Sequence, residues 1–227
     1  MLEKRQEKIL NAIIKEYGKT GIPVGSSGLV EKYRLDVSPA TVRNEMADLE
    51  ELGYIRQPYT SAGRIPTEKS YKYYVGRVEE KKLKPEESDL IKALLHDKTE
   101  FGLKQVAKIV SKISGNAVFW AFHRRNLYYT GITNLLSQPE FVQNNLVYDI
   151  SIIIDRMDEI IEKHFEHFDF VPQIFVGSEN PFSRHCSVIA TKYRHDGHIG
   201  LIGVIGPMRM RYEKNLALIK FIYEKFK

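Results

Sequence analysis

The polar side chains best suited to binding another molecule stand at the start of a helix predicted over residues 39–52. They are Ser38, Thr41, Arg43 and Asn44. Arginine can donate two hydrogen bonds to guanine and asparagine can pair similarly with adenine, while serine and threonine suit phosphates or bases. Val42, Met46 and Leu49 recur at helical spacing and should face the core, which leaves the polar residues toward solvent. This arrangement predicts a helix that reads the major groove of DNA.

The charge along this region is uneven. Residues 1–52 carry 8 basic and 9 acidic side chains, whereas residues 53–78 carry 5 basic and 1 acidic. Acidic residues occupy the far end of the predicted helix, at Asp48, Glu50 and Glu51. That end should therefore lie away from phosphates. The turn over residues 60–64 (TSAGR) offers hydroxyls, a glycine that permits close approach and one guanidinium, which suit a phosphate backbone or a narrow minor groove.

The elements around this helix are typical of a winged helix-turn-helix. Helices are predicted over 3–17, from Ser26 or Ser27 to about Tyr33, and from Thr67 to about 78, with short strands at 54–57 and 64–65. Three helices followed by a small hairpin describe that fold, which we expect over residues 1–78. Because such folds also serve as protein-interaction modules, a scaffold that binds protein rather than DNA is an open alternative.

The rest of the chain has a different pattern. Residues 79–88 (EEKKLKPEES) are charged and contain a proline, so we expect a linker or an exposed helix junction there. Helical periodicity then covers 88–114, 139–168 and 209–226, and β-rich apolar runs fall at 117–122, 127–133, 173–177, 187–193 and 199–205. We therefore expect an α+β domain with a mostly antiparallel sheet over residues 89–227.

Composition narrows the protein's class and location. The chain has 227 residues, is 43% hydrophobic and 28% charged, and has a net charge of +5. This describes a globular protein whose mild basicity is compatible with a polyanionic partner. Cys186 is the only cysteine, the N-terminus is charged where a signal peptide is apolar, and no apolar run approaches the roughly 18 residues that span a bilayer. We expect a cytoplasmic protein with no membrane partner.

Metal binding and catalysis are weakly supported. His185, Cys186, His195 and His198 are close in sequence, and His164 and His167 have helical spacing. Structural zinc sites use tightly paired ligands, whereas Cys186 falls in an apparent strand where a buried thiol is ordinary packing. The chain has no nucleophile elbow, phosphate-binding loop or paired zinc motif. We therefore expect no metal, no cofactor and no enzymatic activity.

Six segments together resemble one protein family. They are residues 23–26 (PVGS), 37–46 (VSPATVRNEM), 57–67 (QPYTSAGRIPT), 131–141 (GITNLLSQPEF), 177–181 (GSENP) and 203–212 (GVIGPMRMRY). This set closely resembles the bacterial heat-inducible transcription repressors of the HrcA family and is distributed over nearly the whole chain. With the reasoning above, it gives a predicted DNA-contact set of Ser26, Ser38, Thr41, Arg43, Asn44, Tyr59, Thr60, Ser61, Gly63 and Arg64.

The resemblance implies a repressor of chaperone operons that binds an inverted-repeat operator as a homodimer. It implies a winged helix joined to a GAF-like domain, and a chaperonin that supports the active repressor. The family's usual inserted dimerisation domain is missing, because only residues 121–127 connect the two predicted strands where it would lie. The mode of dimerisation is therefore open. A ligand-gated transcription factor that senses a small molecule through the GAF-like domain is a further alternative.

Overall fold

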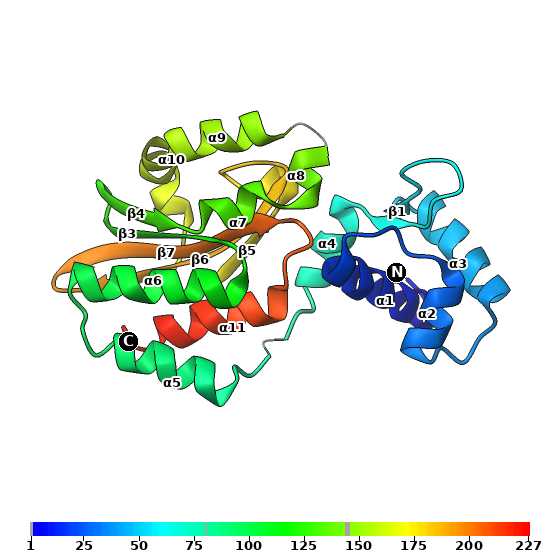
Figure 1. The fold of residues 1–227 in the computed structure, drawn as a ribbon, viewed down its shortest axis with the longest axis horizontal. Helices are drawn as coiled ribbons and strands as arrows, with labels where there is room; N and C mark the ends of the chain where they lie inside the picture. The colour runs from blue at the N-terminus through cyan, green and yellow to red at the C-terminus, as the bar shows by residue number, and fades with distance from the viewer. Residues whose placement is uncertain (1, 80, 144–145) are drawn as a thin grey trace. The chain divides into compact units, whose positions relative to one another are not determined.

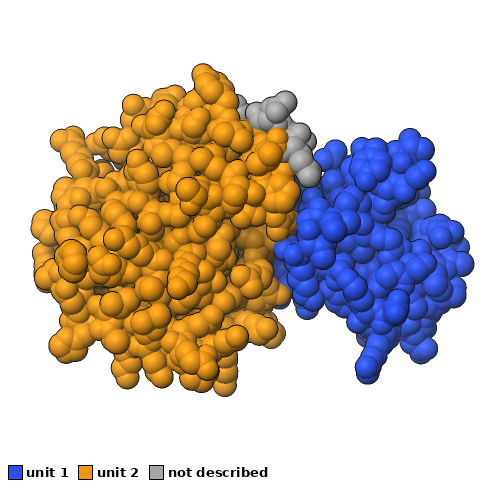
Figure 2. Space-filling model, viewed as in Figure 1, with its two compact units in different colours: residues 1–77 blue, residues 78–227 orange. Residues whose placement is uncertain are grey.

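The computed structural model describes residues 2–79, 81–143 and 146–227. The chain divides into two compact units, residues 1–77 and 78–227 (Figure 2). Each unit has a buried apolar core of its own, so the fold of each can be understood separately.

The first unit is a winged helix-turn-helix, as predicted. Its elements are α1 (Lys4–Thr20), α2 (Ser26–Tyr33), α3 (Pro39–Glu51), β1 (Ile55–Arg56), β2 (Ile65–Pro66) and α4 (Glu68–Val75) (Figure 1). Helix α1 begins with a reciprocal pair of cap bonds between Glu3 and Gln6 and ends at Gly21, which has φ +65°. Helix α2 begins at Ser26, within the predicted range, and its N-cap residue is Gly25 and not a serine.

The second unit is an α+β fold, which confirms the predicted class. Its strands are β3 (Ala117–His123), β4 (Asn126–Thr130), β5 (Gln173–Val176), β6 (Cys186–His195) and β7 (His198–Pro207). They form one sheet in the order β4-β3-β7-β6-β5, and every neighbouring pair is antiparallel. The helices are α5 (Pro85–Leu94), α6 (Glu100–Ser114), α7 (Ile132–Leu136), α8 (Pro139–Gln143), α9 (Val147–Asp155), α10 (Met157–His164) and α11 (Tyr212–Tyr223).

Helices cover both faces of this sheet (Figure 1). Alternate residues of β3 show the division, because Phe119 belongs to the core beneath α7 to α10, whereas Trp120 faces the other way and packs on Tyr193 and Phe226. Phe119 and Trp120 are both wholly buried. This explains why the segment is continuously apolar instead of alternating between apolar and polar residues.

Two long predicted helices are broken in the structure. The periodicity over 88–114 belongs to α5 and α6, which a local cap separates. Asp97 accepts hydrogen bonds from the backbone and hydroxyl of Thr99, at 2.9 and 2.6 Å, and Thr99 caps α6 by accepting from Gly102. Such side-chain bonds compete with continuation of a helix. The segment predicted over 139–168 contains α8, α9, α10 and a short 3₁₀ helix, and Arg156 leaves helical geometry between α9 and α10.

Two other boundaries differ from expectation. Helix α5 begins at Pro85, inside the stretch predicted as a linker or an exposed helix junction. The strand expected over 127–133 ends at Thr130 because Gly131, with φ +75°, turns the chain into α7. A β-carbon at Gly131 would lie 1.9 Å from the Ser111 hydroxyl, so this tight turn requires glycine. Among the described residues, no helix combines the length and apolarity needed to cross a membrane.

Candidate nucleic-acid interface

The start of α3 is fixed by Ser38. Its hydroxyl accepts a hydrogen bond from the backbone N–H of Thr41 at 3.1 Å and lies 2.9 Å from the Thr41 hydroxyl. Pro39 occupies the first helical position, where a missing N–H costs nothing. Sequence therefore dictates where this helix begins, and the two hydroxyls stand beside each other at its exposed end.

The rotation of α3 is set by its apolar stripe. Val42, Met46 and Leu49 are buried against the rest of the first unit, as their spacing predicted. The opposite face exposes Arg43 and Asn44. Within the described part of the chain, neither of these two side chains has a hydrogen-bond or ionic partner, so both are free to bind another molecule.

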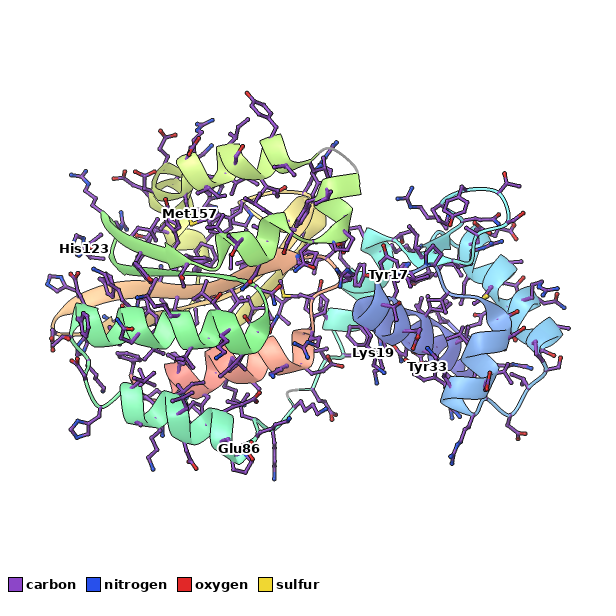
Figure 3. All side chains as sticks on the ribbon, viewed as in Figure 1. Tyr17, Lys19, Tyr33, Glu86, His123 and Met157 are labelled. Carbon is purple, nitrogen blue, oxygen red and sulfur yellow. The ribbon has the colours of Figure 1, made fainter. Side chains whose placement is uncertain are left out.

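Two ion pairs and one cation–π contact hold α1, α2 and α3 together. Arg5 of α1 lies 2.9 Å from the carboxylate of Glu45 on α3. Lys32 of α2 donates to Glu16 of α1, and this hydrogen bond holds the pKa of Glu16 below its ordinary value. Lys19 lies over the ring of Tyr33, 5.6 Å from its centroid (Figure 3). Sequence reasoning missed these contacts because their partners lie far apart along the chain.

The wing is a short antiparallel hairpin. Ile55 pairs with Pro66, and Arg56 with Ile65. Within the turn, Ala62 donates its N–H to the carbonyl of Tyr59 at 3.0 Å, and the Gln57 side chain donates to the Ala62 carbonyl at 3.0 Å. These bonds close the turn and present its tip, residues 59–61, to solvent. Tyr59 is 67% exposed.

The predicted contact residues fall into two groups in the structure. One group is exposed or half-buried on α3 and the wing tip, and consists of Ser38, Thr41, Arg43, Asn44, Tyr59, Thr60 and Ser61. The other is used inside the unit and consists of Ser26, Gly63 and Arg64. Ser26 is only 8% exposed, a β-carbon on Gly63 would lie 2.5 Å from the backbone of Val24, and Arg64 pairs with Glu50.

Most of the basic side chains of residues 53–78 also have partners inside the unit. Lys69 donates to the carbonyl of Leu52 at 2.7 Å, Lys72 pairs with Glu68 at 2.9 Å, and Arg77 stacks on Tyr73 at 3.9 Å. Arg56 on β1 is exposed and has no partner among the described residues. In the sequence Arg56 stood out only as one of the five basic residues of 53–78. Its position on the wing makes it a further candidate contact.

In the second unit an ion pair joins two of the six segments singled out in the sequence, residues 131–141 and 203–212. Arg209 donates from Nε to the carboxylate of Glu140, and its Nη2 donates to Glu140 and Gln138 at 3.1 and 2.8 Å. A β-carbon on Gly206 would lie 2.1 Å from the Asn116 side chain. The residues of these segments are therefore packed against one another inside the unit.

The candidate metal residues do not converge. Cys186 opens β6, pairs with Pro207 and is fully buried, whereas His195 lies at the other end of the same strand beside His198. Burial raises the pKa of the Cys186 thiol to about 12, so it stays protonated at neutral pH. Among the described residues, no cluster of three or more His, Cys, Asp and Glu side chains is arranged to hold a metal ion.

Two family models match the chain. The family described as "Winged helix-turn-helix transcription repressor, HrcA DNA-binding" matches residues 1–79, and the one described as "HrcA protein C terminal domain" matches residues 71–216.

Curated relatives agree with these matches. A "Heat-inducible transcription repressor HrcA" from Symbiobacterium thermophilum is 52% identical, with 98% of this chain and 97% of the relative covered. The repressor of the same name from Carboxydothermus hydrogenoformans is 29% identical, with 98% and 96% covered. The first alignment spans 330 positions although this chain has 227 residues, so the relative has residues without a counterpart here.

The fold is similar to that of a solved structure. It is the crystal structure of "a hypothetical protein", with a TM-score of 0.76 and 18% identity, covering 99% of this chain and 96% of that one. At this identity the likeness concerns the fold alone, and it extends over both units.

Proposed function

This chain belongs to the HrcA family of heat-inducible transcription repressors, and from that premise we propose how it reads DNA. Arg43 and Asn44 contact base edges in the major groove, while Ser38 and Thr41 bind the adjacent phosphates or bases. The proposal rests on one observation: Arg43 and Asn44 are exposed, without a partner among the described residues, on a helix whose buried stripe fixes its rotation. Residues in the first turns of such a helix are those that reach base edges.

The wing supplies the second contact in this proposal. Tyr59, Thr60 and Ser61 lie exposed at its tip, and β1 adds the guanidinium of Arg56, which has no partner in the part of the chain that the structure describes. Hydroxyls and arginines of this kind bind phosphates or enter a narrow minor groove. Ser26, Gly63 and Arg64 are left out of the contact set because their side-chain positions are taken up within the unit.

We further propose that the operator is an inverted repeat, bound by a homodimer in the cytoplasm, and that the genes controlled encode chaperones. Two half-sites need two copies of α3 related by twofold symmetry. In this chain β3 and β4 are joined by only Arg124 and Arg125, where the family's insert is expected, so the dimer must form through another surface. A chaperonin is proposed as the modulator.

Fluorescence anisotropy tests the DNA proposal. The full chain is titrated against a duplex carrying the family-type inverted repeat and against a scrambled duplex, across a salt series. A preference for the repeat of about 10³-fold or more near physiological salt supports sequence-specific repression. Equal and steeply salt-dependent binding to both duplexes contradicts it, because that pattern is a purely electrostatic contact.

Sedimentation and competition test the partners. Sedimentation velocity of the chain, alone and with operator duplex, should give two chains per duplex. Added chaperonin should increase the fraction of chain that binds operator, and an unfolded protein that occupies the chaperonin should reverse the increase. One chain per duplex, or no response to chaperonin, contradicts the corresponding part of the proposal.

A further inference from the structure

A single carboxylate connects the end of α3 to both sides of the wing. Glu50 lies on the last turn of α3, and its Oε1 accepts a hydrogen bond from the backbone N–H of Gln57 at 2.8 Å. Its Oε2 lies 2.8 Å from Nε of Arg64, a close ion pair that lacks the alignment of a hydrogen bond. Gln57 directly follows β1 and Arg64 directly precedes β2, so Glu50 links the helix to both arms of the hairpin.

Arg64 is also held through its backbone. Its N–H donates to the carbonyl of Val24 and its carbonyl accepts from the N–H of Val24, both at 2.9 Å. The neighbouring Gly63 lies so close to Val24 that a β-carbon would be 2.5 Å from the Val24 carbonyl carbon. The side chain of Arg64 is only 22% exposed. Main chain and guanidinium together therefore fix Arg64 between the α1–α2 connection and α3.

From this geometry we infer that Glu50 and Arg64 are positioning residues, which set the spacing between α3 and the wing tip. Arg64 then acts through Glu50 and does not serve as a phosphate ligand. The inference rests on the proposed function, in which α3 and the wing grip one duplex together. It assigns a role to an acidic residue whose charge alone would oppose DNA binding.

We call this restraint of the wing by Glu50 and Arg64 the lock. Its benefit for binding is preorganisation. Two recognition elements bind a rigid duplex together only if their spacing already matches the spacing of their sites, and ordering a loose wing during binding lowers affinity. The wing has only two residues in each strand, so its own ladder offers little resistance to movement. The Glu50 carboxylate adds a restraint on both arms of the hairpin, beside the backbone bonds between Arg64 and Val24.

The lock and a phosphate contact by Arg64 predict different changes in operator affinity for the variant Glu50→Gln. If Arg64 binds phosphate, removal of the neighbouring negative charge should leave affinity unchanged or increase it. If Glu50 positions the wing, the same variant should weaken operator binding about tenfold although it makes the protein more basic. Glutamine keeps an oxygen that can accept from Gln57, so the variant removes the ion pair while sparing that hydrogen bond.

The experiment compares wild type, Glu50→Gln, Arg64→Ala and the double variant by anisotropy on operator and scrambled duplexes across a salt series. Each protein's active fraction is first titrated, so that misfolded material is not counted as weak binding. We expect both single variants to lose about tenfold on the operator. The double variant should bind no more weakly than the weaker single variant, because both remove one interaction. The salt slope should not change.

A neighbouring residue supplies the matched control. Glu51 is exposed and has no partner among the described residues, so Glu51→Gln removes a charge at the same helix end without touching the wing. It should bind operator at least as well as wild type. A reversed pair, Glu50→Arg with Arg64→Glu, should recover part of the affinity that Arg64→Glu loses alone, since the ion pair is restored with its charges exchanged.

Three results would overturn the lock. One is operator binding by Glu50→Gln that equals or exceeds that of wild type. Another is a salt slope that falls by about 0.9 in Arg64→Ala, which marks loss of one phosphate contact. The third is a reversed pair no better than Arg64→Glu. If wild type itself shows no operator preference, the proposed function fails, and that outcome is distinct from the three above.

Discussion

Arg209 and Glu140 lie 69 residues apart in the sequence and form a bidentate ion pair in the second unit. Their side chains are only 14% and 23% exposed. Arg209 also donates to Gln138 at 2.8 Å, so it ties the turn before α8 to the turn after β7. A planar guanidinium that serves two acceptors in this way cannot be replaced by the point charge of lysine without loss.

Replacement of Arg209 by alanine should lower the free energy of unfolding of the second unit by about 2–4 kcal/mol, because a shielded carboxylate loses its partner. Trp120 is the only tryptophan and is buried in β3, so its fluorescence during urea unfolding reports on this unit. Arg125→Ala is the matched control, since Arg125 is 82% exposed and pairs with an exposed Glu162. It should cost less than about 1 kcal/mol. Equal losses in both variants would contradict the structural role of Arg209.

Replacement of Arg43 by alanine should weaken operator binding by about 1–3 kcal/mol and relax the preference at one base pair, because a bidentate base contact is lost. Binding to scrambled duplex should change much less. Arg125→Ala, which removes an exposed arginine from the other unit, controls for the loss of one positive charge. Competition against duplexes altered one base pair at a time measures the effect. Unchanged affinity for Arg43→Ala would mean that α3 is not the reading helix.

Replacement of Gly63 by alanine should loosen the wing, because the new β-carbon would lie 2.5 Å from backbone atoms of Val24 that cannot move aside easily. Hydrogen exchange of the Val24 and Arg64 amides, which donate to each other's carbonyls, should accelerate. Gly28→Ala is the control, since a β-carbon there meets nothing within 4 Å inside α2 and should stabilise the helix by about 0.5–1 kcal/mol. Equal exchange in the two variants would show that the contact is not strained.

Cys186 should react with a thiol reagent only when the second unit unfolds. The thiol is fully buried, and its pKa is raised to about 12, so the folded chain has almost no thiolate at pH 7 to 9. The folded chain should therefore react slowly with Ellman's reagent, whereas the urea-unfolded chain should release one equivalent promptly. Prompt reaction of the folded chain would place the thiol at the surface.

The same burial predicts the direction of the pH dependence of stability. In the unfolded chain the thiol ionises near its ordinary value of 9.0, and in the folded chain only near 12. The folded state therefore binds the proton more tightly, so this contribution is fully present below pH 9 and is lost as pH rises toward 12. Urea midpoints between pH 8 and 11 should fall less steeply in Cys186→Ala than in wild type. Parallel slopes would contradict the shift.

Which face of α3 is exposed in the first unit follows from the residues of that helix alone. The spacing of Val42, Met46 and Leu49 sets which side of α3 is buried, and Ser38 with Pro39 sets where it starts. Both signals lie within one short segment, so the sequence was enough to place Arg43 and Asn44 on the exposed face. The order of elements, three helices and a hairpin followed by an α+β unit, was read from hydrophobic periodicity in the same way.

The internal contacts of Gly63 and Arg64 depended on tertiary structure. A glycine and an arginine beside a turn are equally compatible with DNA contact or internal packing, and their neighbours Val24 and Glu50 come from other segments of the chain. The break between α5 and α6 is by contrast a local effect that hydrophobic periodicity does not show, because the short side chains of Asp97 and Thr99 bond nearby backbone N–H groups in preference to helix continuation. By itself the sequence determined which residues lie on each local surface, because helix and strand periods are properties of neighbouring residues. Only the tertiary structure decided which of those polar groups are already satisfied, because their partners come from distant segments.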